Sequence, residues 1–388
     1  MIKTRTSILA AIALLANFCF GQQKHLTVKV TNPSNVARVS ETITIAWDSL
    51  KSILAQDKPE FLSVNESGAN ATLRSQLVDE NADGTPDFFI FQSDFDPLES
   101  KTFIISTSVE QPQPTVSLVD ARYVEPRQDV AWENDHIAFR MYGPALAAEV
   151  NNGIDVWTKR VRYLIVKKWY EGEEQTPKII YHEDHGEGAD FFDVGRSLGC
   201  GGTGVWFQDK VHQPGVSSAY KIIATGPIRA CFELYYNNWN VDGKKFKETK
   251  RITLDAGQNL NHVEVFFKNY EGSAPMALAC GLVKRPNTKW YKNEEHRWMS
   301  LWGLTTDSLV NGYLGTGVVF EANEFSGWAE DSSQYIALGK TDNDLAFSYY
   351  AGAGWTRSGD FNSVEDWNGY LDRFALNIDS PLQVSIVR

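Results

Sequence analysis

The sequence predicts an all-β protein, a large antiparallel β-sandwich preceded by a small N-terminal β unit. Helical periodicity is scarce, and Gly-Pro, Asp-Gly and Ala-Gly turns separate runs in which apolar and polar residues alternate. Successive strands joined by short turns form antiparallel sheets that pack face to face. By analogy, we expect a mutarotase-like supersandwich. The clearest runs are residues 26–31, 43–47, 88–92, 218–224, 228–236, 246–254 and 261–268.

Residues 1–21 have the pattern of a secretory signal peptide. Lys3 and Arg5 precede an apolar run at 7–16 that is too short to span a bilayer, and Gly21 is a small residue at the expected cleavage point. We therefore expect a periplasmic or secreted protein without membrane insertion.

The mature chain divides at a Pro-rich joint that begins at Gln111. Residues 22–110 are predicted to form the N-terminal β unit, and residues 111–388 the main β-sandwich, which we expect to be the catalytic domain. A short helix is expected at 47–54. The loop Asp79–Asp87 resembles the first half of a calcium-binding EF-hand loop but lacks its final glutamate. The alternative is an ordinary Asp-Gly hairpin turn without metal.

Charge and composition narrow the functional classes. The formal net charge is −12, and removal of residues 1–21 takes away two basic and no acidic side chains, which leaves −14. This balance argues against nucleic acid as a partner. Three cysteines remain (Cys200, Cys231 and Cys280), too few for a disulfide scaffold. The 12 Trp, 15 Tyr and 21 Phe suit a sandwich core, and some could also stack on sugar rings.

The residues with the richest chemistry lie in one segment, 181–204. It contains His182, His185, five acidic side chains, Arg196 and seven glycines. Glycines let a backbone approach a ligand closely. Imidazoles and carboxylates transfer protons near neutral pH. We expect this segment to line the active site.

Two segments before this loop add candidate residues. In the strand predicted at 137–142, alternation places Arg140 and Tyr142 on one face. The alternative for Arg140 is a structural ion pair with Glu133 or Asp135. The basic segment 153–170 contributes Lys159 and Arg162, which would face either an anionic substrate or solvent. Further candidates are Tyr220 on a later strand, and Trp355 and Arg357 in a second Gly-rich loop.

Three motifs carry a family resemblance. They are Trp132-Glu-Asn-Asp with Ile-Ala-Phe-Arg-Met-Tyr-Gly-Pro144, then Gly153-Ile-Asp-Val-Trp157, and then Tyr181-His-Glu-Asp-His-Gly-Glu-Gly with Val-Gly-Arg-Ser-Leu-Gly-Cys-Gly-Gly202. Over essentially the whole mature chain, the sequence resembles secreted Bacteroidetes proteins long described only as a domain of unknown function. One member group acts as oligosaccharide dehydratases in the degradation of the marine polysaccharide ulvan.

The resemblance implies a dehydratase that acts on a sulfated uronic-acid oligosaccharide. Water would be eliminated across C4 and C5 of a glucuronic or iduronic acid at the non-reducing end, next to rhamnose 3-sulfate, to leave a 4,5-unsaturated uronyl group. Such an elimination needs a neutralised carboxylate, a base for the C5 proton and an acid for the 4-hydroxyl.

The sequence offers several residues for each role. Arg140 or Arg196 suits the carboxylate, His185 or His182 the base, and Tyr142 or Tyr220 the acid. Further expected substrate contacts are Lys159, Trp355 and Arg357. A divalent metal held by Asp184 with His182 and His185 is the alternative means of neutralising the carboxylate. No other cofactor is expected.

Two other functions fit the same sequence. An endo-acting polysaccharide lyase would remove the same C5 proton but expel a sugar instead of water. A non-catalytic carbohydrate-binding protein would use the aromatic side chains alone. The sequence leaves the oligomeric state open.

Overall fold

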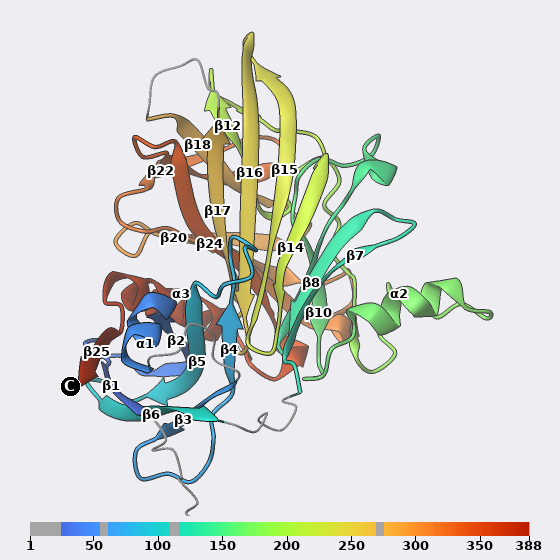
Figure 1. The fold of residues 1–388 in the computed structure, drawn as a ribbon. Coiled ribbons are helices and arrows are strands. Elements are labelled where there is room, and N and C mark those ends of the chain that lie inside the picture. Colours follow the sequence, from blue (N-terminus) through green and yellow to red (C-terminus); the bar gives the residue numbers. More distant parts are fainter. Residues whose placement is uncertain (1–24, 55–60, 109–115, 269–274, 388) are drawn as a thin grey trace, which may run out of the picture.

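The computed structural model describes residues 25–54, 61–108, 116–268 and 275–387 (Figure 1). The predicted signal peptide and the Pro-rich joint at 111–115 lie outside this part of the chain. The predicted all-β class is confirmed, with 52% of residues in strands and 11% in helices. Within the described ranges, no helix is long and apolar enough to cross a membrane.

The N-terminal unit consists of two small antiparallel sheets. The first has the order β25 (Gln383–Val387), β1 (His25–Thr31), β6 (Ser100–Ser108), β3 (Phe61–Glu66). The second has the order β2 (Arg38–Ala46), β5 (Phe88–Phe95), β4 (Ser75–Val78). Val28, Phe91 and Phe103 pack in the core that the two sheets share. Helix α1 (Trp47–Leu54), predicted at these residues, packs on this core through Trp47. Because β25 pairs with β1, both ends of the described chain meet in one sheet.

The main sandwich has an eight-stranded sheet on one side (Figure 1). Its order is β14 (Ala219–Thr225), β15 (Arg229–Val241), β16 (Lys244–Asp255), β17 (Leu260–Lys268), β24 (Ala346–Trp355), β21 (Tyr313–Val319), β20 (Trp298–Leu304), β19 (Thr288–Asn293).

Two five-stranded sheets pack against it. One has the order β11 (Gly188–Ala189), β10 (Asp155–Lys159), β9 (Ile137–Met141), β8 (Asp129–Asn134), β7 (Val119–Val124). The other has the order β13 (Lys210–His212), β12 (Cys200–Phe207), β18 (Ala277–Val283), β23 (Gln334–Lys340), β22 (Phe325–Glu330). Trp132, Phe232 and Leu278, one from each sheet, belong to one continuous core.

Helices cover the outer faces. Helix α2 (Val166–Glu174) lies over the β7–β11 sheet (Figure 1). Helix α3 (Val364–Asp379) packs Trp367 on the outer face of the eight-stranded sheet. The Ser363 hydroxyl caps α3 by accepting from the Asp366 amide at 3.2 Å. Three 3-10 turns complete the structure: η1 (Pro144–Leu146), η2 (Leu309–Asn311) and η3 (Thr356–Ser358).

The sandwich interior also holds polar groups. Cys200, Cys231 and Cys280 are unpaired and buried. Glu248 and Lys250 face the core from β16, and their charged groups are 3.6 Å apart. Burial raises the pKa of Glu248 and lowers that of Lys250.

The Asp79–Asp87 loop uses its own side chains to close a turn. Asp79 accepts from the Asp83 and Gly84 amides at 3.2 and 2.8 Å, and Asp87 accepts from the Glu80 amide at 2.7 Å. Gly84 has a φ of +87°, which a glycine adopts without strain. These bonds match the Asp-Gly turn interpretation.

Candidate active site

The site is built on the outer face of the β7–β11 sheet. Strands β9 and β10 pair so that Arg140 lies opposite Asp155. Neighbouring Phe139 and Val156 point the other way, into the sandwich core. Residues that pair across strands share a face, so the Arg140 and Asp155 side chains emerge together.

Arg140 is the centre of a buried hydrogen-bond cluster. Its Nε donates to Asp155 Oδ2 at 2.9 Å, and one terminal nitrogen donates to Asp190 Oδ2 at 2.7 Å and to the Tyr142 hydroxyl at 2.8 Å. The other terminal nitrogen donates to the Tyr181 hydroxyl at 3.0 Å. A guanidinium with two carboxylates and two phenols is fixed in one orientation. We call these five residues the Arg140 cluster.

Strand pairing brings the 181–190 loop to this cluster. β11 pairs with the edge of β10, and the Asp190 amide donates to the Tyr181 carbonyl at 2.9 Å. Gly188 has a φ of +111°, and a Cβ there would lie 2.0 Å from the Thr158 carbonyl oxygen. Only glycine allows this close pairing. The loop thereby delivers both Tyr181 and Asp190 to Arg140.

His182 stands at the solvent edge of the cluster. Its Nδ1 lies 3.0 Å from the Asp190 carbonyl oxygen and 3.4 Å from the Asp190 carboxylate. A carbonyl only accepts, so Nδ1 carries the hydrogen and Nε2 of the neutral ring keeps its lone pair. Nε2 has no hydrogen-bond partner within the described part of the chain, and the side chain is 55% exposed. His182 is therefore oriented as a proton acceptor.

Burial shapes the acidity of the cluster. It raises the pKa of Tyr142 well above that of a free phenol, with a further contribution from the Asp155 charge that Arg140 partly offsets. Tyr142 therefore keeps its proton at neutral pH. Burial and the neighbouring Asp155 charge also raise the pKa of Asp190. The Arg140 cluster thus contains a protonated phenol, Tyr142, and also orients a base, His182, through Asp190.

Arg127 supplies an accessible positive charge beside the cluster. Its guanidinium carbon lies 5.5 Å from the Tyr181 ring centre and 5.8 Å from that of Tyr170. Its ion pair with Glu173 spans 3.6 Å, and its side chain is 31% exposed. Sequence analysis missed this residue because it stands in the turn between β7 and β8, outside every motif.

Comparison with known proteins places the chain in a family. The model of a family described as "Domain of unknown function (DUF4861)" matches residues 30–384. The chain belongs to the DUF4861 family. Over 397 aligned residues it is 31% identical to "Uncharacterized protein P7" of Formosa agariphila, with 97% of this chain and 98% of that protein covered. The resemblance to a domain of unknown function is confirmed at the level of the family.

Two solved structures share the fold of this DUF4861 chain. An α-mannosidase from Enterococcus faecalis V583 superposes with a TM-score of 0.52 at 10% identity, over 94% of this chain and 46% of that one. A glycosyl hydrolase family 38 protein from Enterococcus faecalis superposes with a TM-score of 0.52 at 12% identity, over 95% of this chain and 48% of that one. The chain spans about half the length of these carbohydrate-active proteins, and at such identities the likeness concerns the fold alone.

The three side chains considered as metal ligands do not converge in the DUF4861 structure. Asp184 accepts from the Gly186 and Gly188 amides at 2.8 and 2.9 Å and from Arg160 at 3.0 Å. Partial burial opposes ionisation, yet the amide and Arg160 hydrogen bonds lower the pKa of Asp184. His185 is exposed, with Nε2 3.2 Å from the Ile180 carbonyl oxygen. Among the described residues, no three His, Cys, Asp or Glu side chains are grouped to hold a metal.

Lys159 is buried beside the cluster and binds protein groups. Its Nζ donates to Glu133 at 2.7 Å and to the Asn134 carbonyl at 2.6 Å. Glu133 also accepts from the Ile165 and Val166 amides at the start of α2. Burial lowers the pKa of Lys159, and Glu133 partly restores it. Glu133 therefore links Lys159 on the sheet to the start of helix α2.

Four other predicted residues lie outside the Arg140 cluster. Arg196 is exposed and donates to the Ala148 carbonyl. Tyr220 is exposed on β14, where its ring stacks 4.2 Å from that of Tyr123. Trp355 is 1% exposed and donates to the Asn311 carbonyl at 2.7 Å, and Arg357 donates to the Val310 carbonyl. Trp355 and Arg357 therefore hold the η2 turn through hydrogen bonds to its carbonyl groups.

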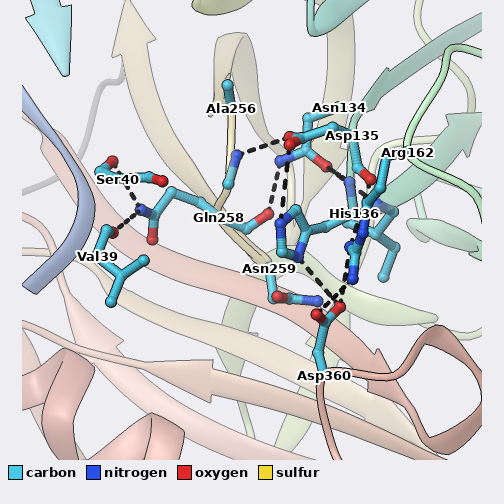
Figure 2. A network of polar contacts seen from close by, with 12 residues as sticks. Val39, Ser40, Asn134, Asp135, His136, Arg162, Ala256, Gln258, Asn259 and Asp360 are labelled. Atoms are coloured by element: carbon cyan, nitrogen blue, oxygen red, sulfur yellow. Dashed lines mark hydrogen bonds and ion pairs between the residues drawn. The ribbon is translucent and has the colours of Figure 1, made fainter. Parts of the chain in front are cut away.

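Arg162 joins a separate polar network (Figure 2). It binds both Asp360 oxygens, at 2.6 and 3.1 Å, and His136 Nδ1 lies 3.1 Å from the same carboxylate. Asn134 donates to the Gln258 carbonyl at 2.6 Å, and the Gln258 amide donates to the Ser40 carbonyl of the N-terminal unit at 3.2 Å. Asp360 and Arg162 thus connect two loops of the sandwich. Gln258 connects the network to the N-terminal unit.

Proposed function

We propose that this protein is a dehydratase that eliminates water across C4 and C5 of the terminal glucuronic or iduronic acid of a sulfated oligosaccharide. One observation carries the proposal: His182 and Tyr142, an oriented base and a protonated phenol, are held by the same buried Arg140 cluster. Proton abstraction beside a carboxylate requires this combination of a base and an acid.

The reaction begins with recognition of the uronate carboxylate. Arg140 already has four protein partners, so its hydrogen-bonding capacity is largely used. Arg127 is partly exposed, and its pairing with Glu173 is long. A guanidinium binds a carboxylate through two parallel hydrogen bonds, and its charge makes the proton at C5 more acidic. Arg127 takes the role that sequence analysis gave to Arg140 or Arg196.

His182 and Tyr142 then divide the proton transfers. His182 Nε2 removes the C5 proton, and the electron pair of that C–H bond forms the C4–C5 double bond. The C4–O bond breaks, and Tyr142 gives its proton to the departing hydroxyl, which leaves as water. Arg140, 2.8 Å from the Tyr142 oxygen, stabilises the phenolate that forms. Water then reprotonates Tyr142, and His182 releases its proton to solvent.

Asp155 and Asp190 hold the reacting groups in position. Both carboxylates bind Arg140, and the Asp190 carbonyl also fixes the His182 ring. Fixed geometry of this kind removes the need to reorganise groups as charge develops.

Paired substitutions in one loop test the assignment. The substrate is a disaccharide of a saturated uronic acid linked to rhamnose 3-sulfate, and the assay follows ultraviolet absorbance of the new double bond conjugated to the carboxylate. His182→Ala is expected to lower kcat at least about 100-fold. His185→Ala, an exposed histidine three residues away, is the control and should retain the wild-type rate. Full activity in the His182 variant would overturn its role.

The product separates this proposal from the two alternatives. An endo-acting lyase would raise the absorbance while shortening the oligosaccharide. A non-catalytic binding protein would leave the absorbance unchanged while still retaining the oligosaccharide.

We further propose export to the periplasm or the medium after cleavage behind Gly21. N-terminal sequencing of the protein recovered from the native host should begin at Gln22. A chain that keeps its first 21 residues would contradict this proposal.

A further inference from the structure

A cavity of about 880 Å³ lies between the N-terminal unit and the outer face of the eight-stranded sheet. Strand β2 lines one side, strands β15, β16, β17 and β24 line the other, and helix α3 contributes a third wall. Figure 1 shows the N-terminal unit against this end of the sheet. The volume of the cavity falls within the range of about 300 to 1,000 Å³ that is typical of small-molecule sites.

Three polar side chains on the sheet enter this cavity without partners. His262 and Glu264 are two apart on β17 and so share a face, and Tyr350 pairs with His262 across β24. His262 Nε2 is buried and makes no hydrogen bond to any described residue. In the same part of the chain, neither the Glu264 carboxylate nor the Tyr350 hydroxyl has a hydrogen-bond partner. A buried polar atom such as His262 Nε2 is costly without a partner unless a ligand or water completes it, whereas Glu264 and Tyr350 are half-buried.

The charges around the cavity disfavour an anionic ligand. Arg229 is paired with Asp255 through two hydrogen bonds of 2.7 and 2.8 Å, and Arg251 binds Glu233 at 2.8 Å. The remaining lining arginine, Arg373, is exposed. Five acidic residues line the cavity against these three arginines: Glu41, Glu80, Asp255, Glu264 and Glu321.

The unpartnered groups are suited to hydroxyls. Burial, with the nearby Arg229 charge, lowers the pKa of His262 to about 4, so its ring is neutral at pH 7. A neutral imidazole has one donor and one acceptor, a carboxylate only accepts, and a phenol does both. A hydroxyl group donates to one such partner while it accepts from another. Several adjacent hydroxyls would satisfy all three side chains.

We propose that this cavity binds a neutral, hydroxyl-rich ligand of the size of one sugar residue. The site is separate from the Arg140 cluster, which lies on another sheet, and it does not rest on the dehydratase proposal. A ligand in this position would contact both the N-terminal unit and the sandwich.

Ligand-observed saturation-transfer NMR tests the proposal with D-galactose, L-rhamnose and D-xylose as neutral probes and D-glucuronate as the anionic probe. At least one neutral sugar should bind the mature protein with millimolar affinity, and D-glucuronate should bind more weakly. Glu264→Gln and Tyr350→Phe should each weaken neutral-sugar binding by about fivefold or more, because each removes a hydrogen-bonding group. Glu330→Gln, the same change on the exposed strand β22, is the control and should bind as wild type does.

Three outcomes would overturn the proposal. They are no binding by any neutral probe, equal or tighter binding of D-glucuronate, and unchanged binding in both cavity variants. Thermal unfolding of each variant shows that it is folded. Glu264 has no hydrogen-bond partner among the described residues, and burial outweighs the attraction of Arg251 and Arg229 and raises its pKa, so Glu264→Gln is expected to unfold at or above the wild-type temperature.

Discussion

Tyr142→Phe separates catalysis from stability more cleanly than any other change at the site. The variant loses the hydroxyl that we assign as the acid, and a positioned acid contributes about 10²- to 10⁴-fold to a rate. That range corresponds to about 2.7 to 5.5 kcal/mol in the activation free energy. We therefore expect kcat to fall by at least about 100-fold, with a smaller change in KM.

The effect of the same variant on folding should be moderate. The Tyr142 hydroxyl accepts from Arg140 at 2.8 Å and donates to Asp155 at 3.3 Å, so the variant loses two hydrogen bonds. Arg140 would keep its hydrogen bonds to Asp155, Asp190 and Tyr181. Loss of two such bonds costs about 1 to 3 kcal/mol in the free energy of unfolding. For a protein larger than 150 residues, this lowers Tm by no more than about 12 °C.

Two measurements on each variant decide the matter. Steady-state rates come from the ultraviolet assay, and Tm comes from circular dichroism. Tyr220→Phe is the matched control, because Tyr220 is an exposed phenol outside the Arg140 cluster, and it should keep the wild-type rate. A folded Tyr142→Phe protein with more than about a third of the wild-type kcat would refute the role of Tyr142 as the acid.

Three further changes have defined outcomes. Arg127→Gln should raise KM for the uronate substrate at least about tenfold with little change in Tm, because it removes a partly exposed cation whose ion pair with Glu173 is long. Arg127→Lys should recover part of the loss, and equal KM values for all three proteins would contradict this. Lys250→Met leaves Glu248 buried without its counter-charge and should lower the free energy of unfolding in urea by about 3 to 5 kcal/mol, whereas the double variant with Glu248→Leu should recover most of that loss. Burial opposes the ionisation of Asp360, but hydrogen bonds from His136 and Arg162 lower its pKa below the ordinary value near 3.8. The stabilisation is therefore fully present above that value and is lost progressively as the pH falls from about 4 through the lowered pKa of the folded state. Asp360→Asn should be less stable than wild type by about 1 to 2 kcal/mol at pH 7, and the difference should be smaller at pH 3. A pH-independent difference would count against the Asp360 assignment.

The strands were predictable because their pattern is local. Alternation of buried and more exposed residues marks β1, β16 and β17 in the sequence, and the short helix at Trp47–Leu54 was expected as well. Pairing of β25 with β1 joins residues more than 350 positions apart and leaves no local signal. Helix α2 was hidden in a basic segment whose charges obscure its apolar face.

At the site, alternation placed Arg140 and Tyr142 on one face, and the structure has them in contact. The expected acidic partners of Arg140 were Glu133 or Asp135. This prediction was wrong, because the pairing of β9 with β10 sets Asp155 opposite Arg140 and leaves Glu133 to Lys159. Partner choice depends on strand register, which the residue pattern alone does not determine.

His262 illustrates the same limit. His262 lies in the predicted strand run 261–268, and the sequence around it shows no functional motif. In the fold, β15, β16 and β17 bring Arg229, Asp255 and Glu264 to the cavity that it lines. Groups gathered from several strands become visible only after the sheet is assembled.

The most direct test of the dehydratase proposal is mass spectrometry of the product formed from a tetrasaccharide with a saturated uronic acid at its non-reducing end, next to rhamnose 3-sulfate. The proposal predicts a product lighter by one water, with an unchanged number of sugar residues and a new ultraviolet absorbance. Shorter products, or an unaltered tetrasaccharide in the presence of folded protein, would contradict it.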